Sequence, residues 1–245
     1  DSVIVTGNNS QQGTLTVGVN DTGYDVKFFG ATASRHMTWD ESADSLIISG
    51  DLDVNDGTIK LDGNYPVGSH NVVLGNDALS SGSLSGSNNV ALGSNSLASN
   101  TSGAQNIGIG RNSLDANTTG DNNIGVGHSV LTTNSTGGNN VAIGREALAL
   151  NTTASNNTAV GYVSLYSNTT GTNNVALGGN TLQPNTTGSQ NTALGKGASA
   201  SNSTGSNNTS VGFEALVSNT TASNNTAVGY QAGYSTTTGS YSTSV

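Results

Sequence analysis

Three carboxylates occupy equivalent positions of this chain, and paired carboxylates are the groups that hydrolyse glycosidic bonds. Asp77, Glu146 and Glu214 each lie two residues after a glycine that recurs every 17 or 18 residues. If each recurrence is one turn of a stacked coil, neighbours among the three lie about 19 Å apart at the usual strand spacing. Two-carboxylate glycosidases need a separation of about 5–9.5 Å. The spacing therefore predicts no catalytic pair within one chain, while a pair formed between chains stays open.

The histidines give no support for a metal site. His36, His70 and His128 are scattered, and the chain has no cysteine. Zinc sites combine Cys and His at short, regular spacings, and calcium-binding nonapeptide coils carry an Asp that these repeats lack. Ser, His and Asp all occur, but a catalytic triad is defined by geometry and not by composition. We therefore expect no metal, no cofactor and no catalytic residue.

The few cations do not form a patch. The chain has six Lys and Arg against fifteen Asp and Glu, which gives a net charge of −9. Arg111 and Arg145 each follow a repeat glycine and are expected to be solvated surface charges. Nucleic-acid binding needs a cationic surface, so this class of partner is excluded. No apolar run approaches the ~20 residues of a membrane span, and no membrane insertion is expected.

Large aromatic residues gather near the beginning of the chain. Tyr24, Phe28, Phe29 and Trp39 could form a platform for carbohydrate. The alternative is that they are the core of a small domain, because this region has almost no other large side chains. We favour the core.

The element that must position those of these residues that follow residue 66 is a repeat of 17 residues. Each repeat contains the run Asn-aliphatic-small-aliphatic-Gly, with one first gap of 18 residues and 17 thereafter. A fixed short period is the signature of a solenoid or an array. The closing glycines are Gly75, Gly93, Gly110, Gly127, Gly144, Gly161, Gly178, Gly195, Gly212 and Gly229.

The positions within one repeat predict a coil with two short strands and two turns. Every repeat has an aliphatic residue directly before the glycine, as at Ile143, and we interpret this column as the core stripe. The small residue between the two aliphatics indicates close packing against that side. A leucine follows four residues after most glycines, although Ser199 and Gly233 interrupt that column. The glycine itself is predicted to supply a backbone angle that a Cβ would forbid.

An asparagine four residues before the glycine is invariant within the array. One hypothesis is a ladder that binds glycans; the other is a buried stack of amides that satisfies backbone groups of the turns. We favour the buried stack. The column consists of Asn71, Asn89, Asn106, Asn123, Asn140, Asn157, Asn174, Asn191, Asn208 and Asn225.

A second recurring motif, Asn-Thr-Thr, is predicted to form the return turn of each coil. An example is Asn151-Thr152-Thr153. The motif reads formally as an N-glycosylation acceptor, an interpretation that we do not favour. A flat array of threonines that orders ice is a further, weaker alternative, because the two threonines are adjacent and lie in a turn.

Two regions follow from these patterns. Residues 1–66 lack the period and are predicted to be a small β domain, with half-buried strands at 14–17, 52–54 and 58–61. Residues 67–245 are predicted to be a parallel β-roll, or β-solenoid, of about ten 17-residue coils. The fold class is therefore all-β. The start at Asp1 and the end at Val245, one residue before the next glycine of the period, lead us to expect a segment of a longer protein.

Each coil offers few large apolar groups, so one sheet face of a single roll would be poorly covered. Self-association would bury that face, and a symmetric homo-oligomer is the usual solution.

The repeats resemble a known family at particular residues. The runs NNVALG (88–93), NNVAIG (139–144) and NNTAVGY (224–230) resemble repeats of YadA-like trimeric adhesin heads. The longer run NTTGTNNVALG (168–178) looks like the variant found in bacteriophage tail fibres and bacterial surface fibres. Residues 13–54 are similar to segments of structural proteins from marine phages, especially cyanophages. The period of 17 departs from the shorter one usual in adhesin heads.

The resemblance implies a homotrimeric β-roll in a virion fibre, with two identical chains, other virion proteins and a host-surface glycan as partners. The expected location is the virion, in a tail fibre or another external fibre. Alternatives are the head of a bacterial trimeric adhesin on the outer cell surface, a glycan-degrading tail spike, and an ice-binding solenoid.

Overall fold

The computed structural model describes residues 26–29, 36–40, 45–49, 70–82 and 84–245, the first three ranges as backbone. The chain divides into two compact units, residues 1–60 and 61–245, close to the division after residue 66 expected from sequence. Pro66 and the strands expected at 14–17, 52–54 and 58–61 lie outside the described residues, as does Tyr24.

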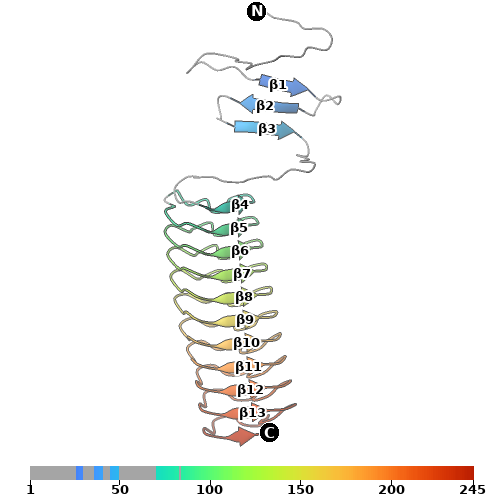
Figure 1. Cartoon of the computed structure of the whole chain (residues 1–245). Coiled ribbons are helices and arrows are strands. Elements are labelled where there is room, and N and C mark those ends of the chain that lie inside the picture. The colour runs from blue at the N-terminus through green and yellow to red at the C-terminus, as the bar shows by residue number, and fades with distance from the viewer. Residues whose placement is uncertain (1–25, 30–35, 41–44, 50–69, 83) are drawn as a thin grey trace, which may run out of the picture. The chain divides into compact units, whose positions relative to one another are not determined.

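The first unit contains an antiparallel sheet of three strands (Figure 1). The strands are β1 (Val26–Phe29), β2 (His36–Asp40) and β3 (Ser45–Ser49). The register aligns apolar positions across the sheet, because Phe28 pairs with Met37 and Trp39 with Leu46. Cross-strand neighbours of this kind share one face of a sheet.

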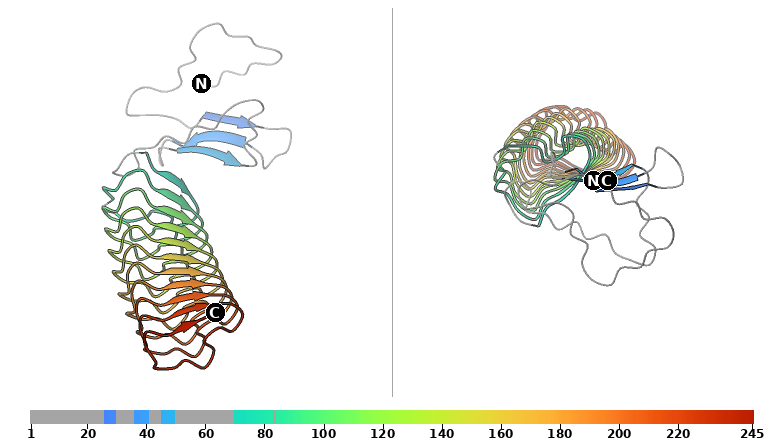
Figure 2. Two further views of the ribbon diagram at one scale, coloured as in Figure 1. Left: turned by 60° about the horizontal axis from the view of Figure 1, so that its bottom comes forward. Right: turned by 90° about the horizontal axis from the view of Figure 1, so that it is seen from above.

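The second unit is a parallel β-solenoid, as the period predicts. Eleven strands form one sheet in sequence order, and each strand pairs in register with the residues 17 or 18 positions away. Figure 2 shows the coils stacked along one direction. The strands are β4 (Val72–Leu74), β5 (Val90–Leu92), β6 (Ile107–Ile109), β7 (Ile124–Val126), β8 (Val141–Ile143), β9 (Thr158–Val160), β10 (Val175–Leu177), β11 (Thr192–Leu194), β12 (Thr209–Val211), β13 (Thr226–Val228) and β14 (Thr243–Ser244).

Each described coil contains one strand, not the two expected from sequence. The run after the glycine includes two residues with left-handed backbone, as at Asn112 (φ 55°) and Leu114 (φ 55°). A β-strand needs extended backbone at every residue, so this run cannot be one. It still bonds from coil to coil, because the Leu114 N–H donates to the Val130 carbonyl oxygen at 2.9 Å.

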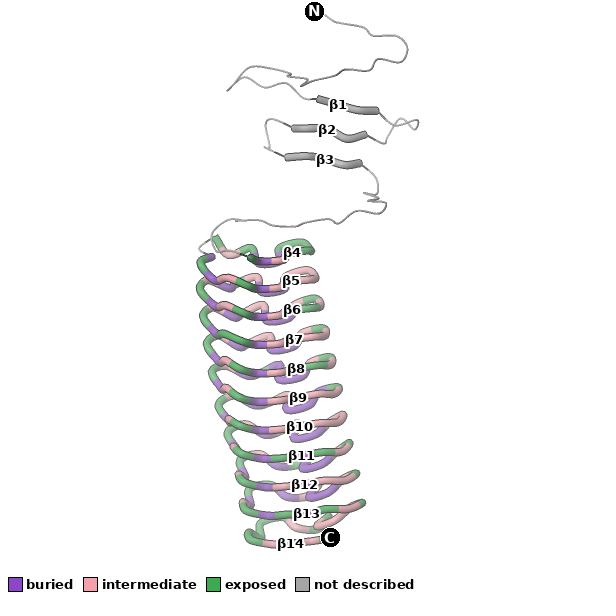
Figure 3. Tube along the Cα trace, in the orientation of Figure 1, coloured by how far each residue is buried: buried purple, intermediate pink, exposed green. Residues whose placement is uncertain are grey.

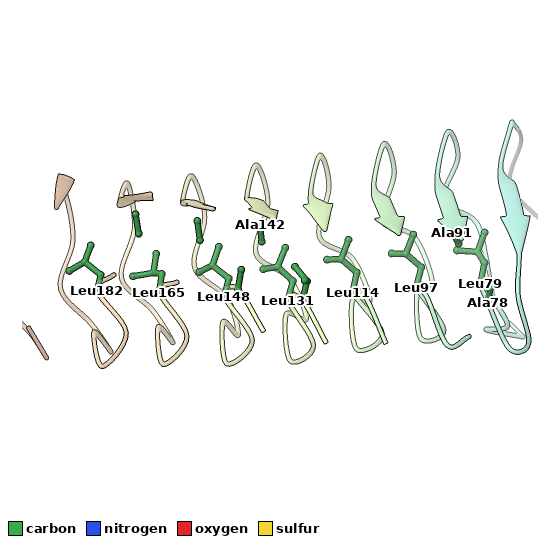
Figure 4. Packing of buried hydrophobic residues seen from close by; sticks show 14 of the residues in the cluster. Ala78, Leu79, Ala91, Leu97, Leu114, Leu131, Ala142, Leu148, Leu165 and Leu182 are labelled. Carbon is green, nitrogen blue, oxygen red and sulfur yellow. The ribbon is translucent and has the colours of Figure 1, made fainter. Parts of the chain in front are cut away.

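The core is a line of leucines facing a line of small residues. The leucine four residues after the glycine is fully buried in most coils, as at Leu114 and Leu148. The middle strand residue faces it; Ala91 and Ala142 are both fully buried. Figure 4 shows the leucines from Leu79 to Leu182 as a continuous row. The coil is so narrow that a Cβ placed on Gly108 would lie 2.5 Å from Ser96 Oγ.

The expected core stripe was therefore assigned to the wrong side of the strand. The aliphatic residue before each glycine points outward: Leu74 is 56% exposed, Leu194 45% and Ile143 40%. Figure 3 shows purple, buried segments alternating with exposed ones along every coil. Adjacent strand residues point to opposite faces, so burying the small middle residue forces both aliphatic neighbours outward.

Candidate functional site: the ladders and outer surface of the roll

The invariant asparagine column forms a buried ladder, named here the first amide ladder (Asn71 to Asn225 at each repeat). The Asn106 backbone N–H donates to Asn89 Oδ1 at 2.9 Å, and Asn106 Nδ2 donates to the Gly120 carbonyl oxygen at 2.8 Å. Asn106 and Asn123 are fully buried. From Asn71 to Asn208 both ends of each amide thus join one coil to the next. Every member of the ladder is buried, so it is not accessible to a glycan.

A second amide ladder, which the sequence reasoning treated only as a turn, runs parallel to the first. Asn117 Nδ2 donates to Asn100 Oδ1 at 2.8 Å and to the Gly120 carbonyl oxygen at 3.0 Å. The recurrence of this asparagine every 17 residues is the feature of the sequence that could have identified the ladder. All of its members are fully buried: Asn100, Asn117, Asn134, Asn151, Asn168, Asn185, Asn202 and Asn219.

The threonines after this second ladder differ from each other. Thr118 Oγ1 donates to the Ser135 carbonyl oxygen at 2.9 Å, whereas Thr119 is exposed. Because the asparagine of each Asn-Thr-Thr motif is buried, its amide is not accessible for glycosylation in the folded roll.

The strand glycines are required by both backbone angle and space. Gly75 to Gly229 all have φ between +120° and +139°. A Cβ on Gly161 would lie 2.5 Å from the Gly178 carbonyl oxygen. These glycines allow successive coils to approach closely, which fits the structural role predicted for them.

One extended surface of the roll is apolar. It consists of the first and third residue of each strand from β4 to β13, and we name it the outer face. These residues are half-buried or exposed, as at Val90 and Ile109. Sixteen of the twenty positions are Val, Ile or Leu, and the other four are Thr158, Thr192, Thr209 and Thr226. Contiguous exposed apolar surface of this kind marks an interaction site.

A second unusual surface borders the outer face. The residue directly after each strand glycine forms the post-glycine row: Asn76, Ser94, Arg111, His128, Arg145, Tyr162, Gly179, Lys196, Phe213 and Tyr230. Arg145 pairs with Glu146 at 2.9 Å, and its guanidinium lies 5.9 Å from the Tyr162 ring centroid. The hydrogen bond from Arg145 to Glu146 raises the pKa of the arginine. Phe213 and Tyr230 stack with centroids 5.5 Å apart.

The candidate carboxylates are not brought together. Asp77 accepts from Asn76, Glu146 pairs with Arg145, and Glu214 accepts from Gln231 Nε2 at 2.8 Å. No cluster of three His, Cys, Asp or Glu occurs among the described residues. His70 and His128 are both exposed and lie in different rows, and His36 is in β2.

One carboxylate was missed by the sequence analysis. Burial raises the pKa of Asp115, although hydrogen bonds from its own backbone and that of Ala116 oppose the shift. Asp115 Oδ1 and Thr132 Oγ1, one coil apart, are buried without a hydrogen-bond partner. The sequence carries no signal for this pair beyond their shared place in the repeat.

Comparison with protein families, with curated proteins and with solved structures finds no significant similarity. The described part of the chain also contains no helix long and apolar enough to cross a membrane. The function of the chain is therefore inferred from the geometry of the roll and from the repeats themselves.

Proposed function

We propose that this chain is a structural and adhesive segment of a homotrimeric virion fibre, in which the roll forms a shaft that projects or presents a host-binding surface. The observation that carries the proposal is the outer face, a straight strip of aliphatic side chains on ten consecutive coils. An isolated soluble roll would expose this strip to water along its whole length.

The dimensions of the outer face suit a subunit contact. Ten strands at ~4.8 Å spacing span about 43 Å, and three residues of strand are about 10 Å wide, which gives roughly 430 Å² per chain. A stable interface buries about 800 Å² per partner. The strip supplies an apolar centre, and polar residues along its other edge, away from the post-glycine row, must supply the rim.

The direction of the chain favours a cyclic assembly. A contact that repeats around an axis parallel to the roll keeps the strands of all the rolls in the same order along that axis, as a fibre requires. Cyclic symmetry is a common solution for homo-oligomers. The number three comes from the resemblance of runs such as 139–144 to trimeric adhesin heads.

The interior supports a mechanical role. Two amide ladders connect successive coils, and a leucine row joins the coils from Leu79 to Leu182, so each of these coils is held by the one before and the one after. Stability in such arrays comes from nearest-neighbour contacts. The isolated carboxylates support our inference that the segment catalyses no reaction.

The partners and location follow from the resemblance of residues 13–54 to phage structural proteins. We propose two identical chains, other virion proteins and a host-surface glycan as partners. Antibodies against the chain should then label external fibres of the virion, and labelling of a bacterial outer surface would favour the adhesin instead.

Light scattering tests the assembly first. The chain has a mass of 24.3 kDa, so a trimer should have a mass of about 73 kDa. A native mass of about 24 kDa would contradict the fibre, because a monomer would leave the outer face uncovered.

A further inference from the structure

The post-glycine row collects every cation of the roll. Between residues 70 and 245 the only lysines and arginines are Arg111, Arg145 and Lys196, and all three lie in this row together with His128. In-register stacking of the coils places them on one line. From Arg111 to Tyr230 the line crosses seven coils, or about 34 Å at the strand spacing.

Two of these cations are available to a ligand. Among the described residues Arg145 is in an ion pair with Glu146, whereas Arg111 and Lys196 have no carboxylate within ion-pair distance. Both are exposed. A chain whose net charge is −9 thus presents positive charge along a single edge of the roll.

The row has one gap, between Tyr162 and Lys196. The coil between them carries Gly179, and a Cβ placed there would meet only the Tyr162 carbonyl oxygen, at 3.9 Å. Arg145 covers one face of the Tyr162 ring, and the glycine leaves the other face without a neighbour from the row. Tyr162 is 53% exposed.

The distance between Tyr162 and Lys196 along the stack of coils is large enough to admit a sugar ring. Tyr162 and Lys196 are two coils apart, or about 9.6 Å at the strand spacing. By contrast, Phe213 and Tyr230 are in adjacent coils and stack with their ring planes 8° apart, so they cover each other. The opening is therefore specific to the coil of Gly179.

We propose that this gap binds an acidic sugar of an extended polysaccharide that lies along the post-glycine row. The apolar C–H face of a pyranose would stack on Tyr162, because an aromatic ring offers a broad apolar surface. The sugar carboxylate would pair with the Lys196 ammonium. This inference depends on the proposed function, since it names the glycan that the fibre would bind.

The spacing of the cations favours a uronic-acid polymer over a nucleic acid. Neighbouring Lys and Arg of the row are two or three coils apart, or about 10–14 Å. Duplex DNA carries one phosphate charge per ~1.7 Å, far denser than this row can neutralise. A uronic-acid polymer carries at most one carboxylate per sugar, a sparser charge that comes closer to the spacing of the row.

The test measures binding of the full chain to polygalacturonate by calorimetry, with neutral dextran and single-stranded DNA as comparison polymers. We expect binding of polygalacturonate only. Tyr162→Ala, Lys196→Ala and the gap-filling Gly179→Tyr should each weaken it by about 3- to 10-fold, as loss of one aromatic or charged contact does. Tyrosine already occupies this row at Tyr162 and Tyr230, so Gly179→Tyr should fold.

The matched control is Phe213→Ala, which removes a ring of the same row that is already stacked, and it should change affinity by less than about twofold. Equal binding of dextran, stronger binding of DNA, or equal losses in Phe213→Ala and Tyr162→Ala would overturn the inference. A 73 kDa assembly (about three chains) that does not bind polygalacturonate would overturn this inference but not the proposed fibre. A monomer would instead overturn the fibre.

Discussion

At the scale of single residues, the asparagines show how a coil with little apolar content stays folded. Asn151 Nδ2 donates to Asn134 Oδ1 at 2.8 Å and to the Ala154 carbonyl oxygen at 3.0 Å. Its own Oδ1 accepts from Asn168 Nδ2 at 3.0 Å. A buried polar group without a partner costs about 1–3 kcal/mol, so each amide stabilises two coils at once.

We predict that Asn151→Ala lowers the free energy of unfolding by about 2–4 kcal/mol, because it leaves Asn134 Oδ1 without its donor and one Asn168 N–H without its acceptor, both of them buried. Chemical denaturation of the purified chain measures this. The neighbouring Thr153→Ala is the control; Thr153 is exposed, and surface changes usually stay within about 0.5 kcal/mol. Similar midpoints for the two variants would show that the ladder contributes little.

At the scale of the element, the coil is the unit, and one coil interrupts the core. Ser199 replaces the buried leucine, and its hydroxyl donates to Ser210 Oγ at 2.9 Å. Ser210 in turn replaces the usual alanine or glycine of the strand. The buried apolar residues accordingly form two clusters, one from Ala78 to Ala198 and a second around Leu216.

The break predicts that the coils after Ser199 open separately from those before it, since repeat arrays depend on neighbour contacts. Ser199→Leu combined with Ser210→Ala should rejoin the leucine row. Burying a leucine contributes about 1.5–3 kcal/mol, so amide hydrogen exchange after residue 205 should slow by about 10-fold or more.

Ser210→Ala alone is the control for that experiment. It removes the partner of the Ser199 hydroxyl and leaves the leucine row interrupted, so exchange should become faster. If exchange in wild type is already uniform across Ser199, or if the double variant leaves it unchanged, the two clusters do not correspond to separate folding units.

At the scale of the whole molecule, the outer face determines what the roll can do. Its aliphatic side chains project from a sheet whose register repeats at every coil. A charge placed on such a face costs little in an exposed monomer and several kcal/mol in a dry contact between chains. Substitution therefore distinguishes a free face from a subunit interface.

We expect Ile109→Asp with Ile143→Asp to reduce the native mass from about 73 kDa to about 24 kDa, because two carboxylates would be buried without partners in each contact. Thr119→Asp with Thr153→Asp has the same two-coil separation on an exposed row outside the outer face, and this variant should stay trimeric. A trimer that tolerates the first pair would place the contact elsewhere on the roll.

Much of the architecture was determined by the sequence alone. The 17-residue period specifies stacked coils, because identical residues must recur at the same place in every turn of a solenoid. The invariant glycines specify a left-handed backbone with no room for a Cβ. In the first unit the described strands β1 to β3 were not among the strands expected, although His36–Asp40 alternates polar and apolar residues as regularly as 58–61 does.

Only the tertiary structure decided which way each strand faces. The run aliphatic-small-aliphatic alternates equally well with either face inward, and general hydrophobicity favours burying the aliphatics. The opposite occurs because Leu114 and its equivalents, from the other side of the coil, fill the narrow interior and leave space only for Ala, Gly or Ser. Close packing across the coil therefore turns Val, Ile and Leu outward, and this packing cannot be read from the sequence of a single repeat.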